Sequence, residues 1–124
     1  MKSFLDSKVI KYIRSIVIDE KISEIAIVTT TNISKLVDNL SENFNSLNVY
    51  NEINDFCGTA EIYFIFPDTK FTFEEIGLIK NALSQKLIIF SFDKNTNEDL
   101  LKLGLIKEFS DKSLCCHSYN LKTY

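Results

Sequence analysis

The sequence predicts a single α/β domain of three layers, with a mostly parallel sheet of six or seven strands and a C-terminal antiparallel β-hairpin. Helical and strand patterns alternate along most of the chain. The strand segments are continuous apolar runs, as expected for parallel strands that are buried on both faces. The chain has 124 residues, which suits one domain over residues 1–124.

The first half of the chain predicts a helix, a strand, a second helix and a second strand. Residues 3–19 place apolar side chains on one helical face, and Ser3 can cap this helix. The helix either packs on its own domain or offers a partner surface. Ile25–Val28 is apolar and β-branched, which favours a buried parallel strand. Residues 33–44 repeat apolar side chains at helical spacing, and Leu47–Tyr50 predicts a short strand.

The middle of the chain carries the strongest strand pattern. Glu61–Phe66 is predicted to be a strand, because apolar and aromatic residues follow Glu61 without interruption until Pro67 ends the run. Thr72 and Glu75 have the spacing of a capping box, which predicts the start of a helix. Leu87–Phe92 then predicts the next strand.

The last quarter predicts a short helix and a closing hairpin. The helix starts near Thr96, and Gly104 ends it. Leu105–Phe109 and Leu114–Leu121 follow each other without an intervening helix. One of these strands is therefore expected to be antiparallel to the rest, at the edge of the sheet or inside it.

Composition limits the classes of function. Net charge is −3, the pI is about 5.1, and opposite charges are interspersed, so binding to nucleic acid or to an anionic membrane surface is not expected. No apolar run is long enough for a membrane span, and the N-terminus lacks the apolar core of a signal peptide. The three cysteines do not have the pattern of a disulfide framework, so we expect a cytoplasmic protein.

The natural ligand position is the turn of residues 29–32, Thr-Thr-Thr-Asn, which follows the first strand. Ligands of open α/β sheets bind at the carboxyl ends of the strands, where amides and hydroxyls can hold an anion. The candidate cofactor-binding residues are Thr29, Thr30, Thr31, Asn32, Glu52 and Asp68. The alternative is that the turn residues only cap the next helix, which is what Thr and Asn usually do.

The order of elements resembles a trimmed Rossmann-like methyltransferase domain, in which alternating helices and strands are followed by a final β-hairpin. Residues 99–109, Asp-Leu-Leu-Lys-Leu-Gly-Leu-Ile-Lys-Glu-Phe, are similar to the Leu-Gly-apolar turn before that hairpin, and residues 116–121 to its last strand. The same turn with the ending Tyr-x-Leu-x-x-Tyr resembles an uncharacterised family of small bacterial proteins with degenerate domains of this kind. The resemblance implies a Rossmann-like fold over most of residues 20–122.

Two departures from the methyltransferase pattern bear on function. Its glycine-rich turn is replaced by residues 29–32, and β-branched residues disfavour the positive φ that glycine allows. In the methyltransferase pattern, a carboxylate after the second strand holds the ribose hydroxyls. The nearest candidate for this role here is Glu52. We therefore expect a non-catalytic, degenerate interaction or ligand-binding module with no cofactor, and a protein or a second copy of the chain as its partner. The alternative is a methyltransferase-like enzyme that binds S-adenosylmethionine or a nucleotide at this turn.

A second alternative is a phospho-receiver-like signalling domain. Asp68 and Lys94 follow strands as such a domain requires, but Thr29 and Thr30 stand where its acidic pair belongs. Residues 115–117, Cys-Cys-His, form a soft-ligand cluster that is too small for a structural zinc site. We interpret it as two small buried thiols and a histidine at a sheet edge.

Overall fold

The computed structural model describes residues 5–40, 44–54, 57–92, 96–111 and 114–120. Their six strands form one sheet in the order β2-β1-β3-β4-β6-β5. The strands are β1 (Glu24–Val28), β2 (Ser46–Tyr50), β3 (Ala60–Ile65), β4 (Ser84–Ser91), β5 (Ile106–Asp111) and β6 (Leu114–Asn120). The first four are parallel, and β6 is antiparallel to both β4 and β5. The predicted α/β class and the mostly parallel sheet are confirmed.

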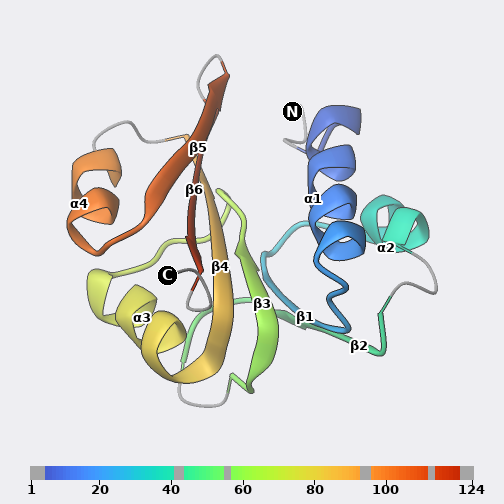
Figure 1. Ribbon diagram of the computed structural model, residues 1–124, viewed down its shortest axis with the longest axis horizontal. Coiled ribbons are helices and arrows are strands. Elements are labelled where there is room, and N and C mark those ends of the chain that lie inside the picture. Colours follow the sequence, from blue (N-terminus) through green and yellow to red (C-terminus); the bar gives the residue numbers. More distant parts are fainter. Residues whose placement is uncertain (1–4, 41–43, 55–56, 93–95, 112–113, 121–124) are drawn as a thin grey trace.

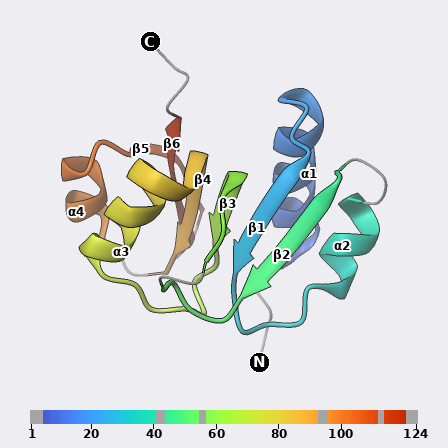
Figure 2. The same ribbon diagram turned by 90° about the horizontal axis from the view of Figure 1, so that it is seen from below.

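Helices lie on both faces of the sheet (Figures 1 and 2). One face is covered by α1 (Ser7–Asp19) and α2 (Ser34–Leu40), and the other by α3 (Phe73–Leu78) and α4 (Thr96–Lys102). The α3 helix continues into a π-helical turn, η1 (Ile79–Leu83), which leads directly into β4. Among the described residues, no helix has both the length and the apolar character that crossing a membrane requires.

The core consists of two apolar clusters, one on each face of the sheet. In β1, Ile25 and Ile27 belong to the cluster with α1 and α2, whereas Ala26 and Val28 belong to the cluster with Ile76 of α3. This split follows from the alternation of side chains along a strand. Because both faces are covered, the central strands appear in the sequence as continuous apolar runs.

The α1 helix starts later than predicted and packs on its own sheet. The predicted cap, Ser3, lies outside the described residues, and the observed cap is Asp6, whose carboxylate accepts a hydrogen bond from the Val9 N–H at 3.0 Å. Val9, Ile13 and Val17 are buried in the cluster on this face. The main apolar face of α1 is therefore covered within the domain.

Two predicted helix signals after β3 are observed. The capping box between Thr72 and Glu75 is present, with bonds of 2.8 and 3.2 Å. Gly104 follows α4 with a φ of 92°, the left-handed conformation that favours glycine. The β4 strand begins at Ser84 rather than at Leu87, because η1 connects to it without a loop.

The last strand lies inside the sheet. Since β6 is inserted between β4 and β5, His117 has Ile89 on one side and Lys107 on the other. Its side chain is completely buried. The expectation of a histidine at a sheet edge is therefore wrong, because the edges of the described sheet are β2 and β5.

Candidate functional site

The strand order reverses between β1 and β3. From β1 the chain passes through α2 to β2 on one side, whereas β3 lies on the other side of β1 and leads through α3 to β4. Ligands of open α/β sheets bind at the carboxyl ends of the two strands that flank such a switch point. Residues 29–32 after β1 and residues 66–70 after β3 occupy this position.

The carboxylate of Asp68 occupies the turn after β1. The Thr29 hydroxyl lies 2.8 and 2.9 Å from the two carboxylate oxygens, within donating distance of both. Thr30 donates twice to Oδ2, from its backbone N–H at 2.5 Å and from its hydroxyl at 2.6 Å. These donors converge on one side-chain anion as they would on a bound one.

Extended sheet pairing holds the two turns together. The Thr29 N–H donates to the Tyr50 carbonyl at 2.9 Å, and the Phe66 N–H donates to the Val28 carbonyl at 3.0 Å. Both bonds continue the pairing of neighbouring strands just beyond their ends. The turn that carries Asp68 is thereby fixed beside the turn after β1.

The hydrogen bonds control the ionisation of Asp68. Partial burial acts to raise the pKa of this carboxyl, but bonds from Thr30, Thr29 and Thr31 together hold its pKa below the ordinary value. No lysine or arginine of the described segments forms an ion pair with it. The carboxylate is therefore ionised at neutral pH, and the groups that stabilise its charge within the described segments are neutral donors.

Two predicted site residues do not join this contact. The Asn32 side-chain oxygen accepts bonds from the Ser34 N–H at 2.8 Å and the Ser34 hydroxyl at 2.6 Å, which is a capping role at the start of α2. Glu52 is exposed after β2, and Asn54 donates to its carboxylate at 3.5 Å. The predicted residues that the structure brings together are Thr29, Thr30, Thr31 and Asp68.

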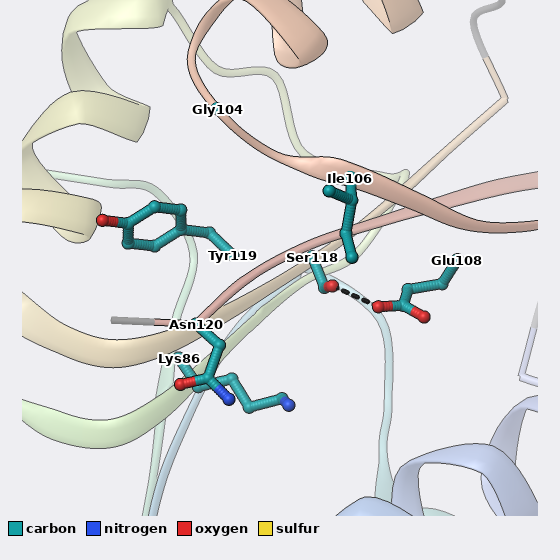
Figure 3. A pocket seen from close by; sticks show the side chains of 7 residues that line it. All are labelled: Lys86, Gly104, Ile106, Glu108, Ser118, Tyr119 and Asn120. Atoms are coloured by element: carbon teal, nitrogen blue, oxygen red, sulfur yellow. Dashed lines mark hydrogen bonds between the residues drawn. The ribbon is translucent and has the colours of Figure 1, made fainter. Parts of the chain in front are cut away.

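A separate pocket of about 340 Å³ lies between β4, β5 and β6 (Figure 3). It is lined by Lys86, Gly104, Ile106, Glu108, Ser118, Tyr119 and Asn120. Ser118 donates to Glu108 at 2.5 Å, and Lys86 forms an ion pair with Glu20 at 2.6 Å. Figure 3 shows the Tyr119 ring pointing away from these polar groups. The sequence did not reveal this pocket, because its walls come from three strands whose order in the sheet cannot be inferred from local patterns.

The Cys-Cys-His cluster is divided by the sheet. Cys115 and Cys116 point to opposite faces of β6, and the Cys116 sulfur lies 3.7 Å from the Tyr12 hydroxyl. Burial raises the pKa of the Cys116 thiol to about 12. Both ring nitrogens of His117 are buried without a hydrogen-bond partner. Within the described segments, no three or more His, Cys, Asp or Glu side chains are placed to hold a metal ion.

Comparison with protein-family models, with curated proteins and with solved structures gives no match. Function therefore has to be inferred from the fold and the site themselves. Two features bear on it: the strand order around the switch point, and the carboxylate that occupies the turn after β1.

Proposed function

We propose that this chain is a non-catalytic, three-layer Rossmann-like domain that serves as an interaction or ligand-binding module. The observation that carries the proposal is the Asp68 carboxylate on the donors of Thr29 and Thr30. In cofactor-binding sheets of this kind, the turn at the switch point receives the ligand. Here the donors of that turn are satisfied from within the chain.

The strand order supports the Rossmann-like part of the proposal. Four parallel strands with the order β2-β1-β3-β4 are followed by a closing hairpin, whose last strand is inserted between β4 and β5. Alternating strands and helices with a final hairpin are what the resemblance to a trimmed methyltransferase domain implies. We place the departure from that class in the chemistry of the turn rather than in the strand order.

A methyl-transferring enzyme that binds S-adenosylmethionine or a nucleotide is the competing function. It needs close backbone approach after β1 and a carboxylate for ribose hydroxyls after β2. The hydroxyls of Thr29 and Thr30 are directed to Asp68, and among the described residues no hydrogen bond joins Glu52 to the turn. These contacts favour the non-catalytic function.

The same contacts count against a phospho-receiver function. A phosphoryl acceptor needs a carboxylate oxygen that is free to attack, together with nearby acidic groups that hold a metal ion. Both oxygens of Asp68 lie within hydrogen-bond distance of the Thr29 hydroxyl, and Oδ2 accepts two further bonds from Thr30. We do not propose phosphotransfer for this chain.

Exposed apolar side chains support an interaction role. They are Ile18, Val49, Phe73, Phe92, Leu101 and Ile106. Phe92, which is 50% exposed, directly follows the carboxyl end of β4, and Phe73, which is 45% exposed, is the first residue of the helix that follows β3. This is the edge of the sheet that carries the turn after β1, so a partner that covered this edge would bury two aromatic rings.

The proposal is tested by thermal unfolding of the wild-type chain with S-adenosylmethionine, S-adenosylhomocysteine, ATP and NAD. We expect no saturable rise in Tm with any of them. A ligand at 100 times its Kd stabilises by about 2.7 kcal/mol, which would raise Tm by several degrees. A saturable rise with one of these compounds that Thr30→Val abolishes would place a cofactor in the turn and overturn the non-catalytic proposal.

A further inference from the structure

We propose that the turn after β1 is a binding site for the carboxylate of a small molecule, and that Asp68 occupies this site when no ligand is present. The inference rests on the ligand-binding part of the proposed function and names its ligand class. The ligand carboxylate replaces that of Asp68 on the donors of Thr29 and Thr30. Asp68 then acts as an internal competitor for the site.

Bonds that do not involve Asp68 hold Thr29 and the backbone on either side of Thr30. Thr29 is buried, its N–H is bonded to Tyr50 of β2, and its hydroxyl accepts a bond from the Thr31 N–H at 3.0 Å. The donating groups do not belong to a helix end, because α2 begins only at Ser34. The Thr29 hydroxyl, and the Thr30 N–H that lies between these two bonded residues, should therefore keep their positions when the Asp68 carboxylate is removed.

The Asp68 side chain can leave without unfolding its turn. Asp68 is exposed, whereas its neighbour Thr69 is buried and bonds to the Phe66 carbonyl through its hydroxyl at 2.8 Å and its N–H at 3.2 Å. These bonds fix the turn without any contribution from the Asp68 carboxylate. A rotation about the Asp68 Cα–Cβ bond is then sufficient to move the carboxylate into solvent.

The contact geometry favours a carboxylate over a phosphate. The donors surround a planar two-oxygen anion, with one contact on Oδ1 and three on Oδ2. No cationic side chain of the described segments pairs with the anion, and the chain itself has a net charge of −3. From the described segments, a dianionic phosphate would receive no positive charge to compensate its desolvation, whereas a monoanion needs less.

The test is a titration with sodium acetate at constant ionic strength, followed through the amide signal of Thr30 by NMR. We expect Asp68→Ala to bind acetate about ten-fold more tightly than the wild type or better, because the tethered carboxylate no longer competes at millimolar effective concentration. The double variant Asp68→Ala, Thr30→Val should bind acetate more weakly than Asp68→Ala, because the Thr30 hydroxyl donor is lost. Asp38→Ala, which removes an exposed carboxylate from α2, should bind as the wild type does.

Two results would overturn the inference. One is a folded Asp68→Ala variant whose Thr30 amide responds to acetate no more than to chloride. The other is binding of inorganic phosphate as tight as that of acetate, which would contradict the ligand class. If Asp68→Ala does not fold, Asp68→Ser replaces the carboxylate with a small polar side chain. The same two results in that variant would overturn the inference. Either failure leaves the proposed function standing, because the cofactor panel tests it separately.

Discussion

The Thr29 hydroxyl lies 2.8 and 2.9 Å from the two carboxylate oxygens of Asp68, although the two residues are 39 positions apart in the sequence. This contact joins the turns after β1 and β3 across the switch point of the sheet. It places a side chain of the protein where open α/β sheets bind their ligands. Breaking this contact should therefore change both the stability of the protein and its binding of ligands.

The coupling between the two turns can be measured with Thr30→Val, Asp68→Asn and the double variant. We expect each single substitution to lower the free energy of unfolding by about 1 kcal/mol, because a charge-assisted bond is weakened or lost at an exposed position. The double variant should lose less than the sum, since both changes remove the same interaction. Urea denaturation measures all three, with Asp38→Asn as an exposed control expected to stay within about 0.5 kcal/mol of the wild type. Strict additivity would show that Thr30 and Asp68 do not interact in solution.

Much of the fold could be predicted because it depends on local patterns. Ile25–Val28 and Ile62–Phe66 are apolar or aromatic on both faces, as expected for strands in the middle of a covered sheet. The capping box at Thr72 can also be predicted, because it depends on two residues that are only three positions apart in the sequence. The start of β4 differs from the prediction, because the π-helical turn before it has no clear signal in the sequence.

The site could be predicted only as a set of candidates. The position of residues 29–32 follows from the rule for strand ends, but the contact with Asp68 depends on which strand lies beside β1 and in what register. The burial of His117 likewise depends on the insertion of β6 between β4 and β5. Strand order is decided by long-range packing, so neither relation could be inferred from neighbouring residues.

His117 makes the stability of the protein sensitive to pH. Its burial, and next the charge of Lys107, lower the pKa of the ring below the ordinary 6.5. The unfolded chain therefore binds a proton at a higher pH than the folded chain does. Stability should be complete above about pH 6.5 and fall as the pH drops below that value. The chain has one histidine, so this side chain dominates the range between pH 7.5 and 5.5.

Replacing this histidine with leucine tests the effect. We expect His117→Leu to raise the free energy of unfolding at pH 7.5 by about 1 kcal/mol, because both ring nitrogens are buried without a partner. The variant should also lose most of the decline between pH 7.5 and 5.5. Urea denaturation at the two pH values provides the comparison. A decline as large as that of the wild type would show that the pH sensitivity arises elsewhere.

Glu61 joins the amino ends of β1 and β3. Its Oε1 accepts bonds from the Ser23 N–H and the Ser23 hydroxyl, both at 2.7 Å, and from the Glu24 N–H at 3.0 Å. We expect Glu61→Ala to lower the free energy of unfolding by about 2 kcal/mol, because two backbone donors lose a charged acceptor. Glu61→Gln keeps a side-chain carbonyl and should lose about half as much. Equal losses in chemical denaturation would mean that the charge, rather than the acceptor atom, provides the stabilisation.

The titration of Asp68 tests the central claim most directly, since a carboxylate held by the turn after β1 must ionise more readily than a free one. Because its pKa is lowered, the group contributes stability above the ordinary value of 3.8, and this stability is lost as the pH falls through the folded-state value. The measurement is the carboxyl ¹³C shift of Asp68 against pH in the wild type and in Thr30→Val. We expect a wild-type pKa below 3.8 that moves up toward it in the variant. An ordinary pKa in the wild type, unchanged by Thr30→Val, would show that the turn is not occupied by Asp68 and would contradict the account.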